Sequence, residues 1–256
     1  MTENYDIAAY GDSIAAFYDE DTAVLEIEPT LEVLSELGGE GPALELGVGT
    51  GRIALPLSKR GMQIDGIDCS SKMLEQLRQK PGSERIKITE GNFRDVSGGP
   101  YRLVFAVFNT FLFLLTQRDQ RRCFENVARC LTDDGVFVIE AAIPNFHRFS
   151  AGAAQLPFGQ YVETLAIEGS RVVLDAGTFD PHTQLLTATE ISVSPEGVKM
   201  YPATMRYAWP SELDLMAEFA GLSLRERWGG WHREKLTFGT HSLVSIYEKA
   251  VGSRDP

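Results

Sequence analysis

Three glycines at alternate positions interrupt an apolar stretch at residues 43–57, which reads ALELGVGTGRIALPL. Gly47, Gly49 and Gly51 carry no side chain, so a ligand can lie against bare backbone, and a following helix would supply free amides. A dinucleotide-binding turn, G-x-G-x-x-G, would need glycine at position 52, but this residue is Arg52. The departure counts against a nicotinamide dinucleotide, while a tight turn without any ligand stays open as an alternative.

The carboxylate of Asp68 is the next group that could act at this turn, because it ends the following apolar segment, QIDGIDC. A carboxylate in that place can accept hydrogen bonds from both hydroxyls of a ribose, which indicates nucleoside recognition. The alternative role for Asp68 is to cap the next helix, which Ser70 could do equally well. Asp65, in the middle of the same segment, is expected to be an ordinary polar position.

An α/β core must position these residues. Short apolar segments alternate with amphipathic helices over residues 43–140, which predicts a mostly parallel sheet with helices on both faces. Residues 160–209 instead alternate apolar and polar positions between turns at EGS, DPHT and PEG, as in an antiparallel meander. The predicted units are an N-terminal helical lid at 1–38, a core at 39–145 and 210–250, and an inserted β lobe at 146–209.

Four segments, ELGVGTGR, GIDCSSKML, EGNFRD and FNTF, resemble in order and spacing those of the class I S-adenosylmethionine-dependent methyltransferases. The resemblance covers the whole chain. It is closest to small-molecule N-methyltransferases of antibiotic pathways, of the macrolide-sugar N,N-dimethyltransferase and lincosamide N-methyltransferase types. The segment YGDSIAAFYD near the N-terminus and the β-rich insertion narrow it to that branch. The resemblance implies a Rossmann-like, seven-stranded sheet and S-adenosylmethionine as the cofactor, with S-adenosylhomocysteine as the product.

The resemblance also implies where each part of the cofactor binds. The glycine turn would pass under the methionine part and the ribose, and Asp68 would bind the ribose hydroxyls. Asn92 stands where the family usually has Asp at the adenine edge, and its amide oxygen can still accept from the adenine amino group. Arg52 either pairs with the methionine carboxylate or is a solvated helix residue. The full predicted set is Tyr18, Glu45, Gly47, Gly49, Gly51, Arg52, Asp68, Cys69, Met73, Asn92, Phe93, Phe108 and Asn109.

Methyl transfer from a sulfonium is an in-line displacement, so the protein mainly supplies alignment and a dry site. Aromatic faces stabilise the positive charge by roughly 0.5–2 kcal/mol per good contact. Tyr10, Ile14 and Tyr18 share one helical face, which by itself is most typical of core packing. The resemblance favours a lid, with Tyr18 near the sulfonium and Tyr10 near the substrate. The predicted catalytic residues are Tyr10, Tyr18 and Phe113, and the predicted substrate-binding residues are Tyr10, Phe111, Phe113, His147 and Trp231.

The nucleophile decides whether a general base is needed, because a hydroxyl must lose its proton during attack whereas a neutral amine can lose it afterwards. The macrolide-sugar enzymes have a histidine at the place matched here by Phe113. The interpretation is therefore a methyltransferase acting on a small-molecule amine in antibiotic or secondary-metabolite biosynthesis. The alternatives are an O-methyltransferase on the same scaffold, an NAD-dependent oxidoreductase and a non-catalytic nucleoside-binding protein.

Composition limits the partners. The net charge of −12 disfavours binding to nucleic acid and to anionic membranes. The N-terminus lacks a signal-peptide pattern and no apolar run reaches the roughly 20 residues of a membrane span, so a cytoplasmic protein is expected. Three cysteines without ligand spacing predict reduced thiols, two of them filling the core, and no metal site. Exposed strands of the lobe predict self-association as a homo-oligomer.

Overall fold

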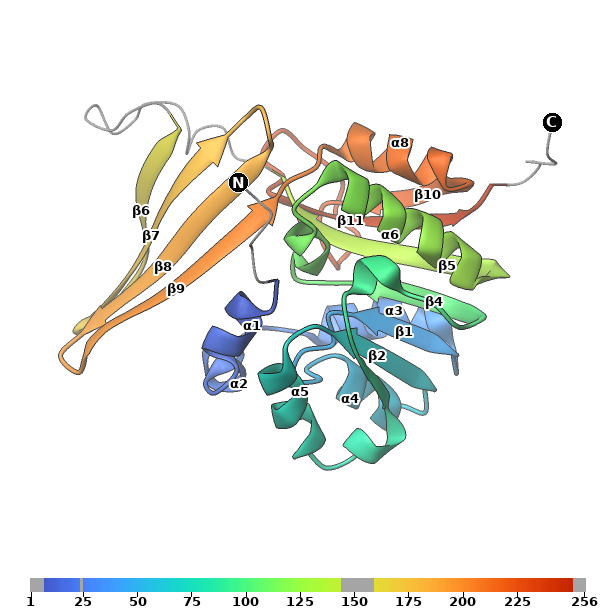
Figure 1. Ribbon diagram of the computed structural model, residues 1–256, viewed down its shortest axis with the longest axis horizontal. Coiled ribbons are helices and arrows are strands. Elements are labelled where there is room, and N and C mark those ends of the chain that lie inside the picture. The colour runs from blue at the N-terminus through green and yellow to red at the C-terminus, as the bar shows by residue number, and fades with distance from the viewer. Residues whose placement is uncertain (1–6, 24, 144–158, 251–256) are drawn as a thin grey trace.

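The computed structural model describes residues 7–23, 25–143 and 159–250, which form two separate β-sheets (Figure 1). Sheet A contains β1 (Ala43–Leu46), β2 (Ile64–Asp68), β3 (Lys87–Glu90), β4 (Tyr101–Ala106), β5 (Leu131–Ala142), β10 (Leu222–Trp228) and β11 (Ser242–Lys249). Sheet B contains β6 (Gln160–Glu168), β7 (Arg171–Asp180), β8 (Leu185–Ser194) and β9 (Gly197–Arg206). The helices are α1 (Ala9–Ile14), α2 (Tyr18–Thr22), α3 (Glu28–Gly38), α4 (Ala54–Lys59), α5 (Ser71–Arg78), α6 (Gln117–Cys130) and α8 (Pro210–Phe219). Short 3-10 turns cover Ser83–Arg85, Phe93–Asp95 and Thr110–Phe113.

The strand order of sheet A is β10-β11-β5-β4-β1-β2-β3, with β11 antiparallel to both of its neighbours and the other pairs parallel. All residues of β1 are buried, which explains why its sequence is a continuous apolar run broken only by Glu45. The predicted seven-stranded, mostly parallel sheet is therefore confirmed. In a parallel sheet the carboxyl ends of β1, β2 and β4 meet at one edge, where the turns that follow them gather.

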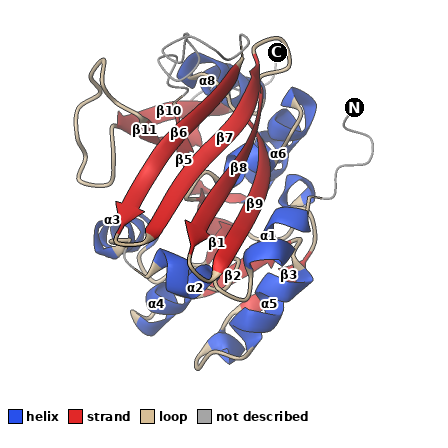
Figure 2. Ribbon diagram, turned by 90° about the vertical axis from the view of Figure 1, so that its left-hand side faces the viewer, coloured by secondary structure: helices blue, strands red, loops and turns tan. Residues whose placement is uncertain are grey.

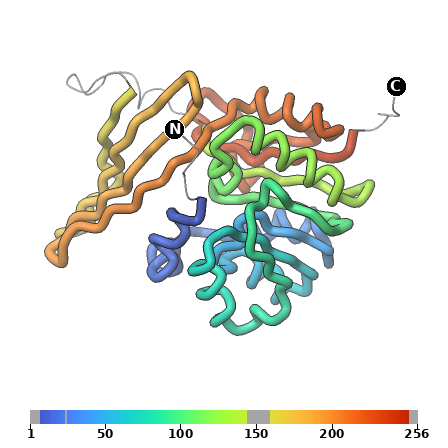
Figure 3. Tube along the Cα trace, viewed as in Figure 1, coloured from blue at the N-terminus to red at the C-terminus, as the bar shows by residue number. Residues whose placement is uncertain are grey.

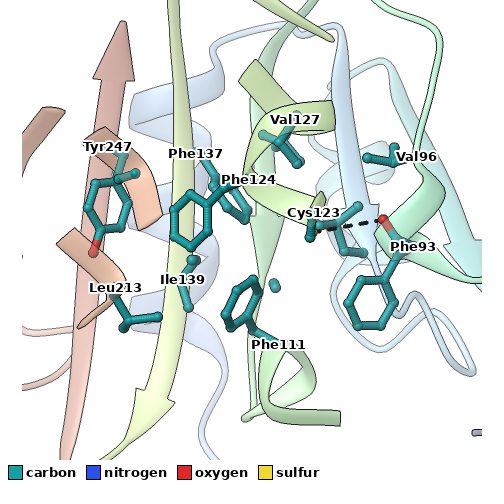
Figure 4. Close-up of a cluster of buried hydrophobic side chains, with 14 of the residues drawn as sticks. Phe93, Val96, Phe111, Cys123, Phe124, Val127, Phe137, Ile139, Leu213 and Tyr247 are labelled. Carbon is teal, nitrogen blue, oxygen red and sulfur yellow. Dashed lines mark hydrogen bonds between the residues drawn. The ribbon is translucent and has the colours of Figure 1, made fainter. Parts of the chain in front are cut away.

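Helices cover both faces of sheet A. On one face α6 and α8 pack on the sheet, and Phe124 of α6 lies edge-on to Phe111, Phe137 and Tyr247, with ring centroids 5.3–5.5 Å apart (Figure 4). On the other face α3, α4 and α5 bury leucines such as Leu34, Leu57 and Leu74. Cys123 and Cys130 are 0% and 3% exposed, so the prediction that they fill the core is confirmed.

Sheet B is inserted between β5 and α8, and α1 and α2 lie between it and α5 (Figures 2 and 3). Phe17, between the two helices, packs on Tyr201 of β9 at a centroid distance of 5.0 Å. Gly11 of α1 approaches α5 so closely that a Cβ there would lie 2.8 Å from the Cβ of Ser70. By contrast, α3 packs into the core, so the predicted unit 1–38 divides into two parts with different surroundings.

Arg206, the last residue of β9, joins sheet B to the core and is 4% exposed. Its guanidinium donates to Gln120 of α6, to Gln184 in the β7–β8 turn at 2.7 Å and to Glu212 of α8 at 2.6 Å. Gln120 donates back to the backbone oxygen of Arg206 at 3.0 Å. These bonds fix the inner end of β9, and with it the side chains that β9 presents to the rest of the molecule.

In the described part of the chain, no helix combines the length and the apolar character needed to cross a membrane.

Candidate active site

A cavity of about 270 Å³ opens at the carboxyl ends of β1, β2 and β4, with α1, α2 and β9 around it. Its lining includes these predicted residues: Tyr10, Tyr18, Glu45, Gly47, Gly49, Arg52, Asp68, Cys69, Met73, Phe93, Phe108, Asn109 and Phe113. Residues far apart in the sequence, from the N-terminal helices to the turn after β4, therefore meet around one space.

The three glycines of the turn have different reasons to lack a side chain. All have positive φ, at 72°, 51° and 81° for Gly47, Gly49 and Gly51. A Cβ on Gly47 would lie 2.3 Å from a methyl of Thr110, and one on Gly51 would lie 2.4 Å from a methyl of Leu77. A Cβ on Gly49 would meet nothing within 4 Å, and Gly49 lines the cavity. Gly49 thus leaves open backbone for a ligand, whereas Gly51 serves packing and is absent from the cavity lining.

Asp68 at the end of β2 reaches directly across to this turn. Its carboxylate accepts hydrogen bonds from the backbone N–H groups of Gly49 and Ser70, each at 2.8 Å. Burial raises the pKa of Asp68, and these backbone donors partly offset that rise. Ser70 caps α5 by accepting from the N–H of Met73, so helix capping does not require the Asp68 side chain. A carboxylate has about four acceptor positions, which leaves Asp68 able to accept ribose hydroxyls as well.

Two acidic and basic side chains, the buried Glu45 and the partly buried Arg52, line the cavity with unused hydrogen-bonding atoms. Glu45 is 3% exposed, and burial raises its pKa well above the usual value. Within the described residues, Glu45 Oε2 and Arg52 Nε and Nη1 have no hydrogen-bond partner. The Arg52 guanidinium lies 3.6 Å from the centroid of the Phe108 ring and 5.6 Å from that of Tyr18. An amino-acid zwitterion, such as the methionine end of S-adenosylmethionine, fits these unpartnered donor and acceptor atoms.

The turn after β4 holds two consecutive non-glycine residues in the left-handed region, Phe108 at φ 53° and Asn109 at φ 64°. Each such residue is strained by on the order of 1–3 kcal/mol, so the surroundings must hold it. The end of β5 does so. Glu140 accepts from the N–H of Phe108 at 2.7 Å, and the N–H of Ala142 donates to Oδ1 of Asn109 at 2.7 Å. Sequence analysis missed Glu140 because it lies inside an apolar strand with no motif around it.

Aromatic side chains close the side of the cavity toward sheet B. The rings of Tyr10 and Phe113 stack with centroids 5.1 Å apart, and Ala203 and Met205 of β9 complete this wall. Burial, with the neighbouring charge of Glu190 among the smaller causes, raises the pKa of Tyr10 to about 12. Tyr10 therefore keeps its proton at any physiological pH. Burial also raises the pKa of Tyr18.

Polar bonds tie α1 and α2 to the edge of sheet A. Asp12 accepts from the Ser70 hydroxyl at 2.5 Å. Asp19 accepts from the Thr50 hydroxyl at 2.6 Å and pairs with Lys80 at 2.5 Å, while Lys80 also donates to the Thr50 carbonyl oxygen at 2.8 Å. Since Thr50 lies between Gly49 and Gly51, α2 is fastened directly onto the glycine turn.

The structure places several predicted site residues away from the cavity. Phe111 is fully buried among Phe124 and Phe137 in the core (Figure 4), whereas Phe113 of the same turn, Thr110–Phe113, lines the cavity. Asn92 uses its amide oxygen to accept from the N–H of Arg94 at 3.0 Å and is absent from the lining.

Trp231, another predicted acceptor contact, also falls outside the cavity lining. Trp231 packs against the core beside Glu140 instead. His147 lies outside the described residues. The lining residues that sequence analysis did not assign to the site are Ile7, Gly11, Ile14, Val48, Ile53, Ser70, Val107, Thr110, Ala203 and Met205. Most are small or aliphatic, so their types give no chemical signal.

Comparisons with known proteins agree with this geometry. Residues 43–135 match a family model described as a methyltransferase domain. The CcbJ methyltransferase from Streptomyces caelestis is 35% identical, with a TM-score of 0.86 over 96% of this chain and 100% of that one. A cypemycin N-terminal methyltransferase of a Streptomyces species is 24% identical over 208 residues, which is 80% of this chain and 82% of that protein.

The fold alone is shared with CalS10, a calicheamicin-pathway amino pentose methyltransferase from Micromonospora echinaspora solved with S-adenosylmethionine bound. It is 18% identical, with a TM-score of 0.60 over 95% of this chain and 92% of that one. These matches remove the NAD-dependent oxidoreductase alternative. The glycine turn, Asp68 and the unpartnered donor and acceptor atoms of Glu45 and Arg52 surround a cavity that fits the cofactor of the matched enzymes. The chain belongs to the S-adenosylmethionine-dependent methyltransferases.

Proposed function

We propose that the protein transfers a methyl group from S-adenosylmethionine to an amine nitrogen of a small-molecule acceptor, in antibiotic or other secondary-metabolite biosynthesis. One observation carries the amine assignment. The acceptor side of the cavity is aromatic and aliphatic, and no histidine is among its lining residues in the part of the chain that the structure describes. Its two lining carboxylates, Glu45 and Asp68, belong to the cofactor end. A neutral amine needs no base at the moment of attack.

The names of related proteins support the same assignment. The cypemycin enzyme is an N-terminal methyltransferase, and CalS10 methylates an amino pentose in calicheamicin biosynthesis. Both names point to an acceptor that carries an amino group. We therefore assign an amine nitrogen as the methyl acceptor.

The proposed roles divide the cavity into two ends. Glu45 and Arg52 bind the ammonium and carboxylate of the methionine part. Gly47, Gly49 and Asp68 hold the ribose. The adenine lies among the side chains at the ends of β2 and β3, namely Cys69, Met73 and Phe93, with Asn92 contributing only through its place in the turn.

When bound, S-adenosylmethionine supplies a methyl group activated by its sulfonium. The protein's own part is to orient and to exclude water. Tyr18 and Phe108 present aromatic faces near the methionine end, and Tyr10 and Phe113 form the aromatic wall beside which the acceptor nitrogen is held. Because the pKa of Tyr10 is raised to about 12, its hydroxyl orients the acceptor as a neutral group and does not act as a base.

The test is turnover of S-adenosylmethionine to S-adenosylhomocysteine with a library of amines and matched alcohols. We expect methylated amines, with a rate that rises with pH through the pKa of each amine and stays level above it up to about pH 10. A rate that instead follows one fixed pKa across all acceptors, with alcohols preferred, would establish the O-methyltransferase. No turnover with any acceptor, despite cofactor binding, would establish the non-catalytic binding protein.

Replacing Tyr10 by Phe should lower kcat about 10-fold, the value of one oriented hydrogen bond, while the Kd for S-adenosylhomocysteine changes less than about 2-fold. The ring that stacks on Phe113 is kept, so only the hydroxyl is removed. Steady-state kinetics and calorimetry measure the two quantities. Tyr101→Phe is the matched control and should leave kcat unchanged. The Tyr101 hydroxyl donates to Asp65 at 2.9 Å, and neither residue lines the cavity. An unaltered rate for Tyr10→Phe would rule out this role.

The homo-oligomer is proposed to form through the face of sheet B that points away from the cavity. The strand register aligns Ile167, Val172, Val193 and Val198 in one row across this face, and Leu174, Ile191 and Met200 in the next. Ile167, Val198 and Met200 are 73%, 62% and 60% exposed. In a chain with a net charge of −12, an uncharged face is where a second copy can approach with least repulsion.

With a strand spacing of about 4.8 Å and a rise of about 3.4 Å per residue, four strands of eight residues form a face of roughly 500 Å². Two copies that pair through this face would bury about 1,000 Å² in total, enough for a specific interface. Met200→Lys combined with Val198→Lys should therefore convert a dimer or larger assembly into a monomer by light scattering. Phe219→Lys on α8, a residue 71% exposed, is the control and should keep the assembly intact. A monomeric parent protein at micromolar concentration would refute the proposal.

A further inference from the structure

We propose that Glu140 is a positioning residue for the methionine carboxylate of the cofactor, acting through Phe108 on Arg52. This inference rests on the proposed cofactor site and adds a residue from β5 that does not itself line the cavity. Three contacts form the path: the Glu140 carboxylate accepts from the Phe108 N–H at 2.7 Å, the Phe108 ring lies 3.6 Å below the Arg52 guanidinium, and Arg52 lines the cavity.

The backbone of Phe108 needs an outside partner to stay where it is. Its φ of 53° belongs to the left-handed region, which a bulky side chain rarely adopts. The strained residue is held because its N–H donates to the Glu140 carboxylate, and Asn109 is held because its Oδ1 accepts from the Ala142 N–H. In the extended conformation that aromatic residues prefer, the Phe108 ring would leave the face of Arg52.

Arg52 in turn needs the ring, because it is a partly buried cation whose buried Nε and Nη1 have no hydrogen-bond partner among the described residues. A guanidinium stacked on an aromatic face keeps its donor edge free for a carboxylate. The charged and titratable groups around it are Glu45 from β1, Glu140 from β5 and Tyr18 from α2. The ring therefore orients Arg52 and leaves its unpaired N–H groups for the ligand.

The hydrogen bond, and not the charge, is the part of Glu140 that matters in this path. Burial raises the pKa of Glu140, while the Phe108 N–H and the nearby charge of Arg52 partly offset that rise, and a partly buried carboxylate is a costly way to hold a neutral N–H. Glutamine has the same length and an oxygen that accepts equally well, whereas aspartate keeps the charge but is one methylene too short to reach Phe108. We therefore expect the parent and Glu140→Gln to bind the cofactor with similar affinity. Glu140→Asp and Glu140→Ala should both bind it much more weakly.

The experiment compares two probes by calorimetry: S-adenosylhomocysteine, which has the amino-acid part, and 5′-methylthioadenosine, which has the same nucleoside without it. Glu140→Ala and Glu140→Asp should weaken S-adenosylhomocysteine about 10-fold and 5′-methylthioadenosine less than about 2-fold. Glu140→Gln should stay within about 2-fold of the parent for both. Arg52→Met should show the same selective loss, and Arg52→Met with Glu140→Ala together should lose no more than Arg52→Met alone, because both act on one contact.

Equal losses for the two probes would show a general structural role and overturn the inference, as would additive losses in the double variant. Glu140→Gln behaving like Glu140→Ala would overturn the hydrogen-bond path. Neither probe needs an acceptor, so these outcomes do not depend on whether an amine is methylated. If the parent protein bound neither probe, the cofactor site itself would be wrong and the inference would fall with it.

Discussion

Asp68→Ala should raise the Kd for S-adenosylhomocysteine about 100-fold, the largest effect on cofactor binding expected from any single side chain. Two hydrogen bonds from ribose hydroxyls to a partly buried carboxylate contribute about 1.5–3 kcal/mol each, and water that enters the alanine variant recovers part of that sum, which leaves about 2.7 kcal/mol or 100-fold. Asp68 also accepts from the N–H of Gly49 at 2.8 Å, so its loss loosens the turn on which the ligand rests. Calorimetric titration measures the change directly.

Two comparisons make this result interpretable. Asp65→Asn lies on the same strand but bonds Tyr101 instead of the cavity, so its Kd should match that of the parent. Burial raises the pKa of Asp68, so acidification protonates it at a higher pH than an ordinary aspartate. Affinity for S-adenosylhomocysteine should therefore fall as the pH is lowered toward that pKa, and this fall should vanish in Asp68→Ala. An identical Kd for Asp68→Ala and the parent would contradict the assignment of the ribose site.

Arg206→Met should lower the free energy of unfolding by about 3–5 kcal/mol, because it leaves a buried carboxylate without its cation. Glu212, whose side chain is 15% exposed, would keep only hydrogen bonds from Gln117 and Gln184. For a protein of this size the loss corresponds to a decrease in Tm of about 6–20 °C. Calorimetry or circular dichroism on heating measures it.

The double variant Arg206→Met with Glu212→Leu provides the sharper check. If the loss comes from the stranded carboxylate, removing that carboxylate should restore most of the stability. Arg225→Met is the control, since Arg225 forms only exposed ion pairs with Glu226 and Glu248 and should change the free energy of unfolding by less than about 1 kcal/mol. A Tm for Arg206→Met within about 2 °C of the parent would mean that the joint between sheet B and the core is held elsewhere.

The parts of the site that could be predicted follow from strand order and local turns. The glycine turn and Asp68 face each other because β1 and β2 are parallel neighbours, and parallel neighbours bring their carboxyl ends together. That Cys69 and Met73 lie at the site could be predicted because they come shortly after Asp68 in the sequence. The sheet itself could be predicted because fully buried strands give continuous apolar runs that contrast with the amphipathic helices between them.

The parts that could not be predicted depend on contacts between distant segments. Phe111 and Phe113 are two residues apart in an aromatic run, and only the shape of the 3-10 turn decides which of them faces the cavity. Ala203 and Met205 become lining residues only because Arg206 anchors β9 against α6 and α8. Asn92 has an amide that suits adenine, but a local backbone N–H two residues later takes it.

The fastening of α2 to the glycine turn should make exchange of the nucleoside depend on ionic strength. The ion pair between Asp19 and Lys80 is partly open to solvent, with side chains 45% and 28% exposed, so added salt weakens it. The contacts of Phe17 and Phe113 on the other side are apolar or aromatic and do not respond to salt in this way. The dissociation rate of S-adenosylhomocysteine should therefore rise with salt concentration, while the association rate of the acceptor should stay unchanged. In an enzyme whose turnover is limited by product departure, moderate salt would act as an accelerator.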